Sequence, residues 1–244
     1  MRGETMPRQV VVTGGTTGIG RAIAARFAAA GDAVVITGRD AERTGKAAAA
    51  IGAAGVACDA ADPAAVTAFA AGLEGQVDVL VNVAGGNLRG PSPDGPLADL
   101  ADWWTRSLAL NLLGTVLTTT AVLPRMPAGG AIIATGSAAA EFAPMPYSAA
   151  KAAVQSWISG LSSQVGPRGI TANTIVPGYV ADTEFYAGTP LPDGMVDGLV
   201  EATHTKRAGT PEDVAGLAVF LAGPDARHIT GQVLHVNGGS FTTR

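Results

Sequence analysis

The segment Gln9–Gly31 constrains the fold of this chain more than any other. The β-branched run Gln9–Thr13 predicts a buried strand of the parallel type, and a glycine-rich turn, Gly14–Gly20, follows it directly. Apolar residues then recur at helical spacing until Gly31, where we expect the helix to stop. A strand, a glycine turn and a helix in this order form a cradle for phosphate, because the helix N-terminus presents free N–H groups. A merely tight turn is the alternative, and we favour nucleotide binding.

Strand and helix patterns alternate along the rest of the chain. Six further apolar runs predict strands at Ala33–Thr37, Gly55–Cys58, Val77–Val81, Gly130–Thr135, Ile170–Val176 and Gln232–Val236. Helical patterns lie between them, at about Asp62–Gly72, Asp102–Leu123 and Tyr147–Val165, and from Thr210 to about Gly223. This alternation predicts an α/β fold with a doubly wound parallel sheet of seven strands, a Rossmann fold. At 244 residues we expect a single catalytic domain, 1–244.

Two connecting segments have distinct compositions. Asn87–Asp99 is rich in Gly, Pro and Asp and predicts a loop, whereas residues 179–206 combine glycines and prolines with short helical patches. Ligands of parallel sheets bind at the carboxyl edge of the strands. We therefore expect residues 179–206 to form a substrate lid over that edge.

Composition excludes several classes of function. Hydrophobic residues make up 47% and charged residues 15%, which indicates a globular protein, and a net charge of −4 without a basic patch argues against nucleic acid. Cys58 is the only cysteine, so no intramolecular disulfide can form, and we expect a cytoplasmic protein. We expect no signal peptide in the short polar N-terminus, no run long enough to span a bilayer, and no metal site.

The pair Tyr147 and Lys151 predicts proton chemistry. Residues four apart on a helix share a face, and a lysine ammonium near a phenol lowers the phenol's pKa from about 10. Such a pair can donate and recover a proton at one atom, as carbonyl reduction and alcohol oxidation require. The alternative is an ordinary surface pair on an amphipathic helix.

The end of the second strand bears on the choice of cofactor. Gly38 has no carboxylate to repel a 2′-phosphate, and the guanidinium of Arg39 can pair with one. We expect Asp40 to cap the next helix. NADP(H) is therefore favoured over NAD(H), which stays possible, and an exposed loop arginine is the alternative reading of Arg39.

Asn111 stands in the middle of a predicted apolar helix, where asparagine is unfavourable. Either it faces solvent, or the local backbone hydrogen bonding is disturbed for a purpose. Its leucine neighbours indicate burial and favour the second interpretation.

Taken together, these motifs resemble the short-chain dehydrogenase/reductase family over nearly the whole chain. The matching residues are Thr13-Gly14-x-x-x-Gly18-x-Gly20, Asp59, Asn82-x-Ala84-Gly85, Asn111, Ser137, Tyr147-x-x-x-Lys151 and Asn173-x-x-x-Pro177-Gly178. The segments Ile229–Gln232 and Val236–Gly239 are similar to those of 3-oxoacyl-[acyl-carrier-protein] reductase-like members.

The resemblance implies roles for these residues. Tyr147 is the implied general acid, Ser137 polarises the carbonyl, Lys151 lowers the tyrosine pKa and binds the nicotinamide ribose, and Asn111 holds a water that links Lys151 to solvent. Besides Tyr147 and Lys151, the implied cofactor contacts are Gly14, Thr16, Thr17, Gly18, Ile19, Gly20, Arg39, Asp59, Ala60, Asn82, Ala84, Gly85, Pro177, Gly178, Val180 and Thr183.

The chain also departs from the family pattern. Val83 replaces the second of two usual asparagines, so one structural hydrogen bond is expected to be missing. Only ten positions separate Ser137 from Tyr147, which shortens the loop beside the substrate. Thr183 lies one residue late, and Thr17 stands where many NADP(H)-preferring members have a basic residue.

Three functions compete. The leading one is NADP(H)-dependent interconversion of a small ketone and a secondary alcohol. The second is 3-oxoacyl-[acyl-carrier-protein] reduction, for which Arg125 and Arg168 are candidate carrier contacts. The third is a non-catalytic nucleotide-sensing regulator.

We also expect a homotetramer or homodimer that uses the helices Asp102–Leu123 and Tyr147–Val165 as its interface. These helices carry more apolar residues than one sheet face would cover, namely Leu117, Val122, Val154, Trp157 and Ile158.

Overall fold

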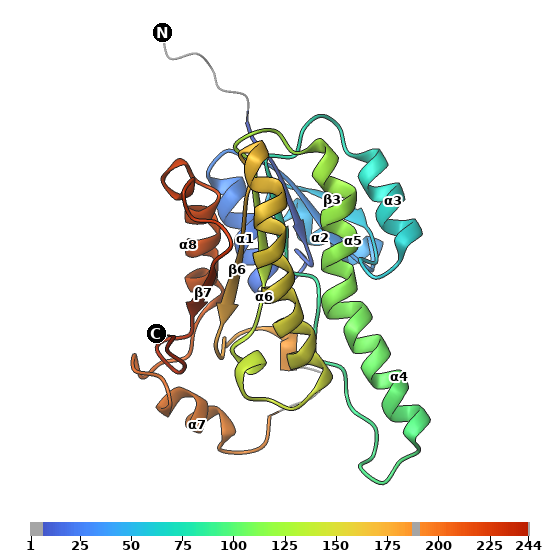
Figure 1. Cartoon of the computed structure of the whole chain (residues 1–244), viewed down its shortest axis with the longest axis vertical. Coiled ribbons are helices and arrows are strands. Elements are labelled where there is room, and N and C mark those ends of the chain that lie inside the picture. The colour runs from blue at the N-terminus through green and yellow to red at the C-terminus, as the bar shows by residue number, and fades with distance from the viewer. Residues whose placement is uncertain (1–6, 187–190, 244) are drawn as a thin grey trace.

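Seven parallel strands form the centre of the fold, in the order β3-β2-β1-β4-β5-β6-β7 (Figure 1). The computed structural model describes residues 7–186 and 191–243. All seven predicted strands are present, with bounds within two residues of those expected: β1 (Gln9–Thr13), β2 (Ala33–Gly38), β3 (Ala54–Ala57), β4 (Val79–Asn82), β5 (Ala131–Thr135), β6 (Thr171–Pro177) and β7 (Val233–Val236). The predicted doubly wound sheet is therefore confirmed.

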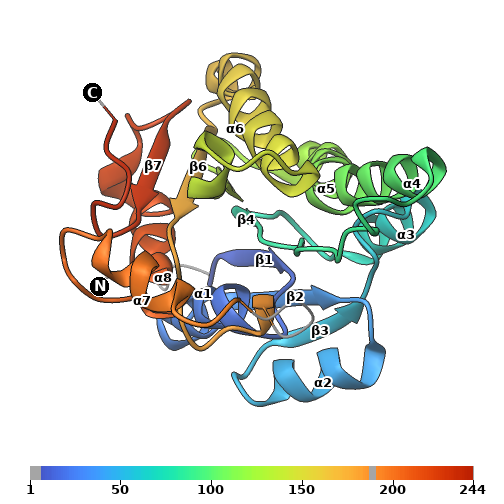
Figure 2. The ribbon, with the colours of Figure 1, turned by 90° about the horizontal axis from the view of Figure 1, so that it is seen from below.

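Helices cover both faces of this sheet (Figure 2). They are α1 (Gly18–Ala29), α2 (Ala41–Ala49), α3 (Pro63–Gly72), α4 (Leu97–Leu108), α5 (Gly114–Val122), α6 (Pro146–Val165), α7 (Met195–Glu201) and α8 (Pro211–Leu221). Successive side chains of β1 alternate between the faces: Val10 and Val12 pack with α1 and α8, while Val11 packs with α5 and α6. Each of these valines is fully buried, because a parallel sheet is covered on both sides.

The strand order places a binding cleft. The chain runs outward from β1 in one direction to β3, then returns to β4 on the other side of β1. The loops that follow β1 and β4 therefore diverge at the carboxyl edge of the sheet, which opens a crevice between them.

Three helices begin with side-chain caps, including the one expected at Asp40. Asp40 accepts a hydrogen bond from Arg43 N at 2.7 Å, and Asp62 accepts one from Ala64 N at 2.9 Å. Thr210 and Asp213 form a reciprocal capping box at the start of α8.

The long helix differs from its predicted bounds. It starts at Leu97 rather than near Asp102, so the predicted loop Asn87–Asp99 is shorter than expected. Pro96 supplies an extended N-cap and Asp99 lies in the first turn, where a carboxylate favours the helix dipole. Loop-forming residues here begin a helix.

The middle of this long helix confirms the interpretation of Asn111. Residues Ala109–Leu113 form a π-helical segment between α4 and α5, with Asn111 fully buried in it. The local backbone hydrogen bonding is therefore disturbed at the residue that predicted the disturbance.

The surplus of apolar surface lies elsewhere than the sequence indicated. Val122, Val154 and Ile158 are fully buried in the core and are not surplus. The exposed apolar side chains of the long helix include Leu97, Leu100, Trp104 and Leu113.

The helical segment Leu97–Arg125 is also long and apolar enough, by length and composition, to cross a membrane, contrary to the expectation that the chain has no such run. In this fold its α5 part packs on the sheet, whereas α4 packs against α6 (Figure 2).

The predicted lid, residues 179–206, contains a 3₁₀ turn, Glu184–Tyr186, and helix α7. Residues 187–190 of this segment lie outside the described residues. Val180 makes an isolated parallel bridge with Gly209, which ties the start of the segment to the body of the protein.

Candidate active site

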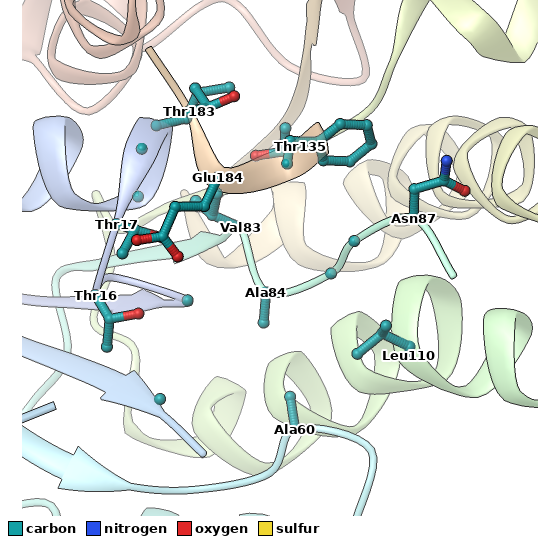
Figure 3. Close-up of a pocket in the computed structure, with 18 of the residues that line it drawn as sticks. Thr16, Thr17, Ala60, Val83, Ala84, Asn87, Leu110, Thr135, Thr183 and Glu184 are labelled. Atoms are coloured by element: carbon teal, nitrogen blue, oxygen red, sulfur yellow. The ribbon is translucent and has the colours of Figure 1, made fainter. Parts of the chain in front are cut away.

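A cavity of about 470 Å³ lies at the carboxyl edge of the sheet (Figure 3). Eighteen of the twenty residues named from the sequence line it: Gly14, Thr16, Thr17, Gly18, Ile19, Gly20, Arg39, Asp59, Ala60, Ala84, Gly85, Ser137, Tyr147, Lys151, Pro177, Gly178, Val180 and Thr183. Asn82 and Asn111 are the two that do not. Segments at the carboxyl ends of six strands, β1 to β6, thus bring one set of predicted residues together.

The glycine turn after β1 has the shape of a phosphate cradle. Gly14 has a positive φ of 65°, and a Cβ there would lie 2.8 Å from the backbone of Ala84. A Cβ at Gly20 would lie 2.2 Å from Gly14 O. Both positions therefore need glycine, and the turn lies against the loop that follows β4.

The N-terminus of α1 faces this turn. Thr17 is the N-cap but makes no side-chain capping bond among the described residues, so the first N–H groups of the helix stay available to an anion. Thr13 Oγ1 accepts hydrogen bonds from Val83 N and Ala84 N, both at 3.1 Å, and so holds the opposite wall. These features fit the pyrophosphate of a dinucleotide.

Two arginines, Arg39 and Arg43, line the cavity beyond β2. Arg43 was not predicted from the sequence, although it lies in the first turn of the helix that Asp40 caps, directly after the cofactor loop. Arg43 forms an ion pair with Glu184 of the predicted lid.

Packing also bears on why glycine stands at position 38, in addition to the charge argument made from the sequence. A Cβ there would lie 2.5 Å from Thr44 Oγ1 and 2.6 Å from Thr16 Cγ2. A side chain at this position would require Thr44 or Thr16 to shift, so packing as well as charge favours glycine here.

Tyr147 and Lys151 lie in the first two turns of α6, which begins at Pro146. Both are buried, and Lys151 Nζ donates a hydrogen bond of 2.8 Å to Thr135 O at the end of β5. The ammonium lies 5.8 Å from the centre of the Tyr147 ring. The expected face-sharing of the pair is therefore present.

The expected lowering of the Tyr147 pKa by Lys151 is not found. Burial raises the pKa of Tyr147 to about 12, and the nearby Ser137 side chain offsets only part of this. Burial lowers the pKa of Lys151 to about 8. Both groups lie out of water, where the charged form of each is disfavoured, and desolvation is the largest cause of each shift.

Ser137 follows β5 and begins a short 3₁₀ turn, Ala138–Glu141. Its Oγ accepts a hydrogen bond of 3.2 Å from Ala139 N, which leaves the hydroxyl proton free to donate toward the cavity. The trimmed loop between Ser137 and Tyr147 is thus a compact turn that orients this hydroxyl.

Asn111 acts behind the cavity wall. Its Oδ1 accepts from Gly86 N at 2.9 Å, and its Nδ2 donates to Gly86 O and Ser107 O, both at 3.0 Å. A Cβ at Gly85 would lie 2.6 Å from Asn111 Oδ1. The π-helical turn therefore fastens the loop after β4 to the long helix.

Asn82 also points away from the cavity. Its Nδ2 donates to Thr119 Oγ1 of α5 at 2.9 Å, while its buried Oδ1 has no hydrogen-bond partner in the part of the chain that the structure describes. The bond expected to be missing is that of the asparagine replaced by Val83, and it stays a prediction.

Sequence analysis missed the aromatic side of the cavity. Phe185 and Tyr186 line it, and the Phe185 ring meets the Tyr147 ring edge-on with centroids 5.3 Å apart. The signal available was the run Glu184-Phe185-Tyr186 in a chain with few aromatic residues. Their position gives the space beside the phenol an apolar wall.

The candidate carrier contacts lie far from this cavity. Arg125 precedes β5 and Arg168 precedes β6, so both stand at the amino edge of the sheet, opposite the cleft. Their guanidinium groups donate to backbone carbonyls there, Arg168 to Met126 O at 2.8 Å. They therefore do not supply a basic docking surface near the site.

Cys58 lies in the cavity lining at the end of β3, and burial raises the pKa of its thiol. Across residues 7–186 and 191–243, no group of three His, Cys, Asp or Glu side chains could hold a metal ion.

Comparisons with known proteins agree with this geometry. Residues 14–240 match the family described as Enoyl-(Acyl carrier protein) reductase. The chain is 36% identical to the short-chain reductase protein NovJ of Streptomyces niveus, over 94% of this chain and 92% of that protein. It is also 36% identical to D-threitol dehydrogenase of Mycolicibacterium smegmatis, over 94% and 91%.

Among solved structures, a short-chain dehydrogenase from Burkholderia cenocepacia in complex with NADP superposes with a TM-score of 0.84. It is 35% identical, and the match covers 96% of this chain and 97% of that one.

Proposed function

The chain belongs to the short-chain dehydrogenase/reductase family, whose members are oxidoreductases acting on C=O and CH–OH groups, and on that premise we propose that it interconverts a ketone and a secondary alcohol with NADP(H) in the cytoplasm. The substrate is a small molecule, with Tyr147 as general acid and base. One observation carries the proposal: the buried pair Tyr147 and Lys151 opens into the same cavity as the glycine turn.

The glycine turn and the N-terminus of α1 would hold the pyrophosphate, and the loop after β4 would face the rest of the dinucleotide. When bound, the dinucleotide supplies or accepts the hydride. Arg39 and Arg43 at the far end of the cavity support NADP(H), because each guanidinium can pair with a 2′-phosphate.

Tyr147 donates its phenolic proton to the carbonyl oxygen as the carbonyl carbon is reduced. A pKa of about 12 keeps this phenol protonated at neutral pH. The alkoxide that forms on the substrate is a much stronger base than a phenolate, so the transfer is favourable. The raised pKa is therefore compatible with reduction.

Ser137 and Lys151 support this proton transfer. The free hydroxyl proton of Ser137 donates to the same carbonyl oxygen and polarises it. Lys151, with a pKa of about 8, is mostly an ammonium at pH 7 and stabilises the phenolate that forms. Asn111 holds the loop that faces this pair.

The test is a panel of small ketones and secondary alcohols, assayed with both nicotinamide cofactors. Tyr147→Phe should lower kcat by about 10²–10⁴-fold while a cofactor still binds, because only the acidic proton is lost. Tyr179→Phe is the matched control, since this ring lies outside the cavity lining. A Tyr147→Phe protein with wild-type turnover would refute the mechanism.

A further inference from the structure

We propose that Glu184 is a selectivity residue of the nucleotide site. Its carboxylate is paired with the guanidinium of Arg43, and a nucleotide 2′-phosphate must displace it to bind there. The inference rests on the proposed use of NADP(H). It gives the predicted lid a direct part in choosing between nucleotides that carry a 2′-phosphate and nucleotides with a free 2′-hydroxyl.

The ion pair spans the cavity from wall to wall. Arg43 stands on α2, beyond the end of β2, and Glu184 stands 141 residues later in the 3₁₀ turn Glu184–Tyr186. Both residues line the cavity, and Figure 3 shows the Glu184 side chain pointing into it. A cavity-lining carboxylate is therefore bound to a cavity-lining guanidinium.

The base of the turn rests on the phosphate cradle. Thr183 Cγ2 would lie 3.3 Å from a Cβ at Gly18, so the residue before Glu184 sits directly over the first turn of α1. Thr183 and Val180 line the same wall. Glu184, the next residue, therefore enters the cavity beside the anion site.

The ion pair itself stabilises the fold little. The Arg43 and Glu184 side chains are 52% and 59% exposed, and exposed pairs contribute little because water screens them. A carboxylate, however, presents two oxygens with the geometry of phosphate to the same guanidinium. The pair thus resembles the contact that a 2′-phosphate would make.

Competition follows from charge. A nucleotide with a 2′-phosphate brings about two further negative charges to a place already holding one carboxylate. It must break the Arg43 pair and either displace Glu184 or bear its repulsion. A nucleotide with a free 2′-hydroxyl neither breaks the ion pair nor meets this repulsion. The arginines favour the nucleotide with a 2′-phosphate, and Glu184 makes that preference smaller.

Isothermal titration with adenosine 2′,5′-bisphosphate and with 5′-AMP separates these effects. Glu184→Gln should tighten the bisphosphate by about threefold to tenfold, the scale of one exposed ion pair and one screened repulsion, and 5′-AMP by less than about twofold. Asp193→Asn is the matched control, because it removes one exposed carboxylate from the same segment at a residue outside the cavity lining.

The second arm tests the route through Arg43. Arg43→Gln should weaken the bisphosphate, and adding Glu184→Gln to it should restore no more than about twofold. A full gain in the Arg43→Gln background would overturn the proposal. So would an unchanged or weaker bisphosphate affinity in Glu184→Gln, an equal gain for 5′-AMP, or the same gain in Asp193→Asn.

These measurements involve no hydride transfer. If Tyr147→Phe stayed active while Glu184→Gln tightened the bisphosphate, the catalytic proposal would fail and the selectivity role would stand. If neither nucleotide bound the wild-type protein, both would fall.

Discussion

Replacing Asn111 by alanine tests how far one side chain holds the site together. The substitution removes three hydrogen bonds, two to the backbone of Gly86 and one to Ser107 O. Gly86 belongs to the loop that forms the cavity wall after β4, and Asn111 is fully buried. The wall should therefore loosen when its anchor is lost.

The expected cost follows from these contacts. A net contribution of about 0.5–1.5 kcal/mol per hydrogen bond gives about 1.5–4.5 kcal/mol for three. Alanine leaves room for water to reach the Gly86 groups, so we expect the lower part, about 1.5–3 kcal/mol. For a chain of this length, about 2–4 °C per kcal/mol converts this to a fall in Tm of about 3–12 °C.

Thermal unfolding followed by circular dichroism measures this fall. Ser107→Ala is the control, because Ser107 lies four residues earlier on the same helix, is equally buried, and has a hydroxyl without a hydrogen-bond partner among the described residues. Its removal should shift Tm by less than about 2 °C. An Asn111→Ala protein that melts as close to the wild type as this control would refute the reasoning.

Three further predictions follow from named contacts. Arg39→Leu should lower the preference for NADPH over NADH by about tenfold to somewhat over a hundredfold, since one charge-assisted contact contributes about 1.5–3 kcal/mol. Gly38 is kept in this variant, so that Thr44 and Thr16 need not shift. A wild type whose kcat/KM already favours NADH would contradict the role of Arg39. Asp213→Ala should cost about 1 kcal/mol at pH 7 through loss of the α8 capping box. Arg207 first, then Thr210, hold the pKa of Asp213 at about 2, below its ordinary 3.8, so this stability is present above pH 3.8 and is lost as pH falls through 2; urea titrations of wild type and variant should converge over that window, and a constant difference would exclude the linkage. Light scattering should give a dimer or tetramer, because Leu97, 82% exposed, and its apolar neighbours along α4 need cover, and a monomeric mass would refute it.

The fold could be predicted from sequence because its signals are local. The run that became β1 ends at Gly14, and the run that became β5 lies between Gly130 and Gly136. Thr210 and the proline after it mark the start of α8. The start of α4 could not be predicted in the same way. Pro96 and Asp99 are favoured both in loops and in a first helical turn, and only the apolar residues that follow decide between them.

The site divides along the same line. Asn111 could be found because an asparagine among leucines conflicts with a regular helix, and the conflict is resolved by the π-helical turn. The ion pair of Arg43 and Glu184 could not be predicted, because the two residues are 141 positions apart and no local sequence pattern links them. The sequence explains Gly38 by charge, because a carboxylate would repel a 2′-phosphate. The close approach of Thr44 and Thr16 to this position is a second constraint, and it depends on packing that the sequence does not show.

The pKa of Tyr147 shows why residue type and spacing do not determine chemistry. Four-residue spacing places Lys151 beside the phenol, and that much is local. Whether the lysine lowers the phenol's pKa depends on how much water both groups keep, and that depends on the sheet, α6 and the turn Glu184–Tyr186 together. Here burial dominates, so the pKa of Tyr147 rises to about 12 while the pKa of Lys151 falls to about 8. A protonated phenol beside a lysine that is still mostly charged at pH 7 is the state from which a carbonyl can be reduced, whereas alcohol oxidation first requires the phenolate that burial disfavours. Residue spacing therefore places the two groups together, whereas burial sets the direction in which each pKa shifts.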